Sequence, residues 1–120
     1  MVKAIDLYRT MKHYFRKGSD AKIKIKIAGD RKRYDINEFC TGYMVEYGNV
    51  IIVGKECNDK PVLTVDTLAQ LLSEHRVYWN ENTTLLYNNG VRCNLITEIK
   101  ISRTSLTLEV DVFKNNAHTD

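Results

Sequence analysis

Glu98 and Lys100 form the residue pair in this chain that is most typical of catalysis. Metal-dependent nucleases of one large class carry Glu-x-Lys on a strand, because the carboxylate holds magnesium and the lysine polarises the attacking water. Alternate residues of a strand share a face, so these two side chains meet that requirement. The candidate upstream acids, Asp66 and Glu81, do not lie on an obvious preceding strand. A small metal-dependent nuclease is therefore the third of three hypotheses for this chain.

Other enzyme classes need residue spacings that the sequence lacks. The histidines, His13, His75 and His118, have no second His or Cys three or four residues away, the spacing that places two metal ligands on one helix face. No Gly-x-Ser-x-Gly elbow, Gly-x-Gly-x-x-Gly loop or Walker sequence occurs. We therefore predict a protein that is not an enzyme, with no catalytic residues, no metal site and no cofactor.

Size, apolar runs and cysteine usage indicate the class and the compartment. The chain has 120 residues, of which 43% are hydrophobic and 28% charged, as is usual for one globular domain. Its longest uncharged apolar run, residues 50–53, is far shorter than a membrane span. Three widely spaced cysteines without an export signal are typical of reduced thiols in a cytosol. We predict one cytoplasmic domain over residues 1–120, with a flexible tail at 114–120 and no membrane contact.

Positive charge is concentrated at the start of the chain. The formal net charge is +3, but residues 1–33 hold 11 Lys or Arg side chains against three acids. This asymmetry indicates a partner that carries negative charge on its surface. The side chains that we predict to contact the partner lie on one strand and the hairpin after it: Lys22, Lys24, Lys26, Arg31, Lys32 and Arg33.

Two segments have the three/four spacing of an amphipathic helix, residues 4–17 and 65–79. Thr64 precedes the second segment and can cap it, because a threonine hydroxyl accepts a hydrogen bond from the first turn. The clearest strand is Lys22–Ile27, where strict alternation places three isoleucines on one face and three lysines on the other. Further strands are predicted over residues 33–39, 43–53, 83–87, 92–102 and 106–112.

The two halves of the chain, residues 4–53 and 65–113, both have the order helix–strand–strand–strand. A shift of about 60 residues aligns Leu7 with Leu68, Met11 with Leu72, Ile36 with Ile96 and Glu38 with Glu98. Two explanations stay open, a duplication or a chance similarity of two α+β units. In either case we predict an α+β fold with two layers, in which two helices cover one face of an antiparallel sheet.

The first half also resembles a type of short protein that is common in bacteriophage and prophage genomes. The similarity consists of an opening helix, Asp-Ala-Lys-Ile-Lys-Ile at residues 20–25 and Gly-Asn-Val-Ile-Ile at residues 48–52. It covers residues 4–53 and includes no functional residues. Such proteins are mostly of unknown role. The resemblance implies a mobile-element accessory protein, a class that includes inhibitors of host defence systems.

Our leading hypothesis is a non-enzymatic protein-binding module whose basic residues steer it to an acidic patch on another protein. The resemblance suggests that this partner is a host or phage protein. Mimicry of DNA is not expected, because a phosphate mimic would be strongly acidic and this chain is basic. Exposed edge strands would also be compatible with a dimer.

Non-specific nucleic-acid binding through the same basic half is the alternative hypothesis. Lys22, Lys24 and Lys26 would form a row with a spacing of about 7 Å along the strand, and could neutralise several phosphates together with Lys12, Arg16 and Lys17 on the preceding helix. However, no aromatic residues are interleaved with these lysines to stack on bases. The strand lysines could also pair across the sheet with Glu109 and Asp111.

Overall fold

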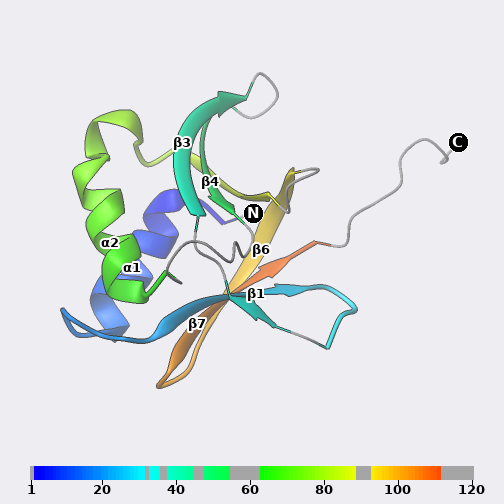
Figure 1. The fold of residues 1–120 in the computed structure, drawn as a ribbon. Helices are drawn as coiled ribbons and strands as arrows, with labels where there is room; N and C mark the ends of the chain where they lie inside the picture. The colour runs from blue at the N-terminus through cyan, green and yellow to red at the C-terminus, as the bar shows by residue number, and fades with distance from the viewer. Residues whose placement is uncertain are drawn as a thin grey trace, which may run out of the picture.

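The structure is a computed structural model that describes residues 2–31, 33–35, 38–44, 48–54, 63–88 and 93–111 (Figure 1). The helices are α1 (Ala4–Tyr14), α2 (Val65–Glu74) and the short 3-10 helix η1 (Arg76–Tyr78). The strands are β1 (Lys22–Ile27), β2 (Tyr34–Asp35), β3 (Glu38–Met44), β4 (Gly48–Gly54), β5 (Thr84–Asn88), β6 (Cys93–Ile101) and β7 (Ser105–Val110). The predicted α+β class is therefore confirmed. The predicted tail at 114–120 lies outside the described residues.

Helix α1 forms where the apolar spacing predicted it, but it is shorter than expected. Leu7 and Met11 are 0% and 1% exposed and attach the helix to the core. Asp6 stabilises the first turn, since its carboxylate accepts a hydrogen bond of 2.9 Å from the backbone N–H of Lys3. The helix ends at Tyr14 because the following residue is extended, and Gly18 then turns the chain with a φ of 81°.

Helix α2 begins as predicted and ends five residues early. Thr64 Oγ1 accepts a hydrogen bond of 3.2 Å from the backbone N–H of Thr67, which confirms the cap. The predicted helix continued to Trp79, whereas α2 ends at Glu74 and is followed by η1. This turn lets the Trp79 indole fold back, where its Nε1 donates to the carbonyl of Leu72 at 2.8 Å. Trp79 is 3% exposed and belongs to the core.

The described strands form one sheet in the order β2-β1-β7-β6-β5-β4-β3. Its pairings are mixed, since β1 lies parallel to β7 and β4 lies parallel to β5, while the other neighbours are antiparallel. The predicted antiparallel sheet is therefore wrong. A parallel pair needs a long crossover between its strands, and α2 lies in the connection that joins β4 to β5.

The predicted two-layer arrangement is also wrong, because the sheet is curled rather than a flat layer. The strand predicted over residues 33–39 is divided between β2, which pairs with β1, and β3, which pairs with β4. These are the two edge strands, yet Asp35 and Glu38 are only three residues apart and so lie within about 11 Å of each other. The sheet must curve to bring its two edges this close, and Figure 1 shows the curvature at β3 and β4.

The third predicted strand, residues 43–53, also differs. Tyr43 and Met44 end β3, and β4 starts at Gly48 opposite Met44. The sequence predicted one continuous strand because β-favouring residues lie both in β3 and in β4, which run in opposite directions. The residues between the two strands lie outside those described.

The pairings of the two halves correspond to each other. Strand β6 pairs with β5 through Cys93–Leu95 and with β7 from Ile96 onward. In the first half, β2 pairs with β1 and β3 pairs with β4. The first strand of each half lies parallel to the last strand of the other half. The correspondence is compatible with both explanations, a duplication or a chance similarity.

One hydrophobic cluster joins both helices to the sheet. It contains Leu7 of α1, Leu68 of α2 and Ile23 of β1, together with residues of β5, β6 and β7. Helices α1 and α2 therefore pack on the inner face of the curled sheet, next to each other (Figure 1). Among the described helices, none has the length and apolar character needed to cross a membrane.

Candidate partner-binding surfaces

The predicted lysine row lies on the face of β1 that points away from the helices. Ile23 and Ile25 are fully buried in the core, so the alternation of a strand directs their neighbours outward. Lys22 is exposed, and Lys24 and Lys26 are half-buried. The outward-facing side chains of β1, β6 and β7 are called the outer sheet face below: Lys22, Lys24, Lys26, Glu98, Lys100, Thr107 and Glu109.

The remaining predicted contact residues lie next to this face. Arg31 and Arg33 are both exposed, one after the turn that ends β1 and the other just before β2. Arg33 is near enough to Lys100 to lower the pKa of its ammonium group, although nearby acids outweigh this effect. Lys32 lies outside the described residues.

The outer sheet face carries both signs of charge. In the parallel register of β1 and β7, Lys24 lies opposite Thr107 and Lys26 lies opposite Glu109. On the other side of β1, Lys24 lies opposite Asp35 of β2. Acidic residues therefore occur on both strands that flank the lysine row.

Glu109 forms an ion pair with a residue that was not predicted as its partner. Its Oε2 lies 3.0 Å from Nζ of Lys100 on the neighbouring strand β6. The hydrogen bond and the charge of Glu109, with a further contribution from Glu98, raise the pKa of Lys100. Thr107 lies between Lys24 and Lys100 in the register and is only 4% exposed. The aliphatic parts of flanking side chains thus cover the sheet, as long amphipathic side chains commonly do.

The residues of the nuclease hypothesis are not brought together. Glu98 and Lys100 are exposed on the outer sheet face, whereas Asp66 of α2 faces a groove between the helices on the other side of the sheet. Glu81 is exposed in the turn before β5. Within the described ranges, no three His, Cys, Asp or Glu side chains are grouped so that they could hold a metal ion.

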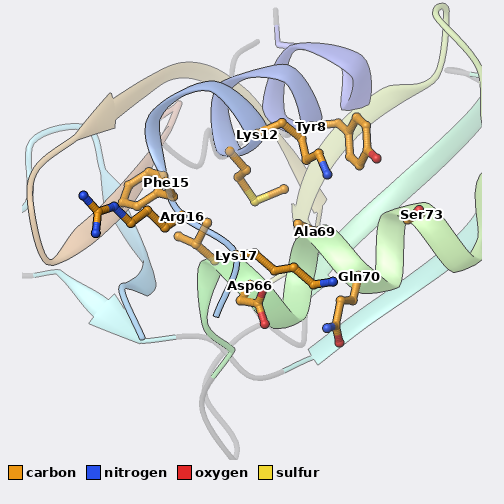
Figure 2. Close-up of a pocket in the computed structure, with 11 residues that line it drawn as sticks. Tyr8, Lys12, Phe15, Arg16, Lys17, Asp66, Ala69, Gln70 and Ser73 are labelled. Carbon is orange, nitrogen blue, oxygen red and sulfur yellow. The ribbon is translucent and has the colours of Figure 1, made fainter. Parts of the chain in front are cut away.

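The basic residues at the end of α1 form a separate surface. Lys12, Arg16 and Lys17 line a groove between α1 and α2, as Figure 2 shows. The sheet separates this groove from the outward-facing lysines of β1, because the helices pack on its inner face. The nucleic-acid hypothesis combined these cations into one patch, and the structure divides them between two surfaces.

The groove has a volume of about 340 Å³. Its apolar lining comes from Met11 of α1, from Phe15 just after this helix, and from Val65 and Ala69 of α2. Sequence reasoning missed this feature. The available signal was the small pair Ala69 and Ser73, which share the α2 face that lines the groove and leave space beside α1.

Two large side chains with apolar surface are exposed in η1, the short helix that follows α2. Val77 and Tyr78 of η1 are 84% and 63% exposed. The turn that carries them is stabilised by contacts between Arg76 and Trp79, the residues before and after them. The Arg76 guanidinium stacks 4.0 Å from the centroid of the Trp79 ring and donates from Nη1 to the Trp79 carbonyl at 2.7 Å.

Comparison of the chain with protein-family models, with curated proteins and with solved structures finds no match. The resemblance of residues 4–53 to short phage proteins therefore stays a prediction.

Proposed function

We propose that the protein is a non-enzymatic protein-binding module that presents its outer sheet face to a partner with an acidic patch. The observation that carries this proposal is the mixture of charges on that face. A phosphate backbone has one sign of charge and would be repelled by Glu98 and Glu109, which lie beside the lysine row. A protein surface can place a base opposite each acid and an acid opposite each lysine.

The basic residues of this surface would act mainly during encounter. Lys22, Arg31 and Arg33 are exposed around the end and the edge of the outer sheet face, where they can attract an acidic surface over several ångströms. Lys24, Lys26 and Lys32 complete the proposed contact set. Such steering raises the association rate more than it slows dissociation. From the phage resemblance, we propose a host or phage protein as the partner, including a defence nuclease that is inhibited by occupation of its surface.

Non-specific nucleic-acid binding is the second candidate, because the outward lysines of β1 keep the regular spacing of a strand. The two candidate functions differ in how strongly binding depends on salt and in the molecule that is bound. Binding to phosphates should fall steeply with salt on any duplex, since each neutralised phosphate releases a counterion.

The experiment is a pull-down from a host lysate with the tagged full chain, with and without nuclease treatment. The charge-reversal variant Lys22→Glu/Arg31→Glu is compared with Arg9→Glu/Arg103→Glu, which changes the net charge equally at exposed positions outside the outer sheet face. We expect one protein in stoichiometric amount after nuclease treatment, lost with the first variant and kept with the second. If nucleic acid is the main companion and dissociates at moderate salt, the alternative function is correct.

A further inference from the structure

We propose that the groove between α1 and α2 is a second docking site, which binds an acidic amphipathic segment of a partner protein. This site is independent of the outer sheet face, because it lies on the opposite side of the sheet. The proposal depends on the shape of the groove, its apolar floor and the charges on its rim.

The floor of the groove is built from two aligned rows of side chains. Met11 and Val65 at its base are 1% and 2% exposed, so they are fixed by the core below them. Tyr8 lies three residues before Met11 on the same face of α1, and Phe15, the residue that follows the helix, extends the row. From Tyr8 to Tyr14, the last residue of α1, the helix rises by about 9 Å. The accessible apolar surface of the groove therefore lies on the half-buried Tyr8, Phe15 and Ala69, where a partner segment can place an apolar side chain.

The helices run in opposite directions, which gives the groove two different ends. At one end, the Tyr8 ring lies 5.7 Å from the Trp79 ring, which follows α2. At the other end, Phe15, Arg16 and Lys17, which follow α1, line the groove together with Val65 and Asp66 at the start of α2. The first end is thus aromatic, whereas the other end carries Arg16 and Lys17.

The rim of the groove is predominantly basic. Lys12, Arg16 and Lys17 are exposed, and Asp66 is the acid among the lining residues. Figure 2 shows Lys17 extending over the groove toward α2, while the guanidinium of Arg16 points outward. Nζ of Lys12 lies 5.9 Å from the centroid of the Tyr8 ring. If the partner segment carries a carboxylate on each side of an apolar residue, these carboxylates can pair with the cations on the rim beside α1. This charge complementarity favours an acidic partner segment.

A nucleic acid fits this groove less well than a peptide. The volume of about 340 Å³ accommodates a few side chains rather than a strand with its phosphates. The lining alternates apolar residues with charges instead of forming a continuous basic track. A peptide with apolar residues at helical spacing and glutamates between them matches both the floor and the rim.

The first test measures the fluorescence anisotropy of such a designed Leu/Glu peptide when the full chain is added. Two control peptides replace the glutamates by lysines or the leucines by serines. We expect the Leu/Glu peptide to bind at least about tenfold more tightly than either control. Equal binding of the serine control would overturn the proposal, because the apolar floor would then have no role.

The second test locates the site. Lys12→Glu/Arg16→Glu should weaken binding of the Leu/Glu peptide at least about tenfold, and Ala69→Leu, which fills the groove without changing charge, should also weaken it. The single charge reversal Arg9→Glu, at an exposed position of α1 that does not line the groove, should bind as the unaltered protein does, whereas Lys12→Glu alone should weaken binding. Amide chemical shifts of the unaltered protein should change on α1 and α2. Shifts confined to β1, β6 and β7, or tighter binding of a DNA oligonucleotide than of the peptide at this groove, would overturn the proposal.

Discussion

Lys100 of β6 and Glu109 of β7 are joined across the outer sheet face, with 3.0 Å between Nζ and Oε2. The lysine is 56% exposed and the glutamate 22% exposed, so the glutamate is the more buried partner. The pair lies beside the lysine row of β1, where Lys26 is opposite the same Glu109. One acid therefore lies between two basic residues from different strands.

The pKa of Lys100 should report the charges around it. It is raised above its ordinary value of 10.5, first by the hydrogen bond to Glu109 and then by the charges of Glu109 and Glu98. We expect Glu109→Gln to lower this pKa more than Glu98→Gln, whereas Arg33→Gln should raise it. NMR titration of the Lys100 side chain distinguishes these three changes. Because the folded-state pKa is raised, the contribution of the contact is constant near neutral pH and disappears only as the pH rises through the raised value. A larger effect of Glu98→Gln would contradict the geometry.

The two faces of β1 should differ sharply in their tolerance of substitution. Ile25 is fully buried, so Ile25→Ala should lower the free energy of unfolding by about 2–5 kcal/mol through lost burial and a cavity. Lys22→Ala on the exposed face should change it by less than about 0.5 kcal/mol. Urea denaturation followed by circular dichroism provides both values. Similar costs for the two variants would show that the strand is turned differently.

Arg76 should control the environment of the single tryptophan. Its guanidinium stacks on the Trp79 ring at 4.0 Å, and a planar group is needed for that contact. Arg76→Ala should shift the tryptophan emission to longer wavelength and lower the free energy of unfolding by about 1 kcal/mol. Arg76→Lys keeps the charge without the planar group and should give an intermediate shift. An unchanged emission maximum in Arg76→Ala would contradict the stacked arrangement.

The hydroxyl of Thr64 should account for the start of α2. Thr64→Ala removes the acceptor for the N–H of Thr67 and should lower the free energy of unfolding by about 1 kcal/mol. Thr64→Ser retains the oxygen and is the matched control, with a much smaller expected cost. Chemical denaturation of both variants checks this prediction, and it fails if serine is as damaging as alanine.

Local features of the fold could be predicted because they depend on neighbouring residues. The alternation in β1, the cap at Thr64 and the apolar faces of both helices are all encoded within a few positions. Strand direction could not be predicted in the same way. The parallel pairing of Ile23 with Leu106 depends on a crossover and on the closing of the core, and no local pattern distinguishes it from antiparallel pairing.

The candidate surfaces were predictable to different degrees. The outward direction of Lys22, Lys24 and Lys26 follows from alternation alone, and the structure agrees. Their separation from Lys12 and Arg16 does not follow, because it depends on which side of the sheet the helices cover. The groove beside Ala69 needed the packing of α1 against α2, which sequence spacing leaves undefined.

The pairing of β1 with β7 also has a consequence for synthesis of the chain. Residues 22–27 can acquire their neighbours at 105–110 only after the ribosome has made both segments. Until then, the buried isoleucines of β1 lack one side of their packing, and the lysines that alternate with them keep the emerging segment hydrated. A contact that spans so much of the chain also predicts slow folding for a domain of this size. The same alternation that orients the outer sheet face would thus protect the nascent chain from aggregation before its last strand arrives.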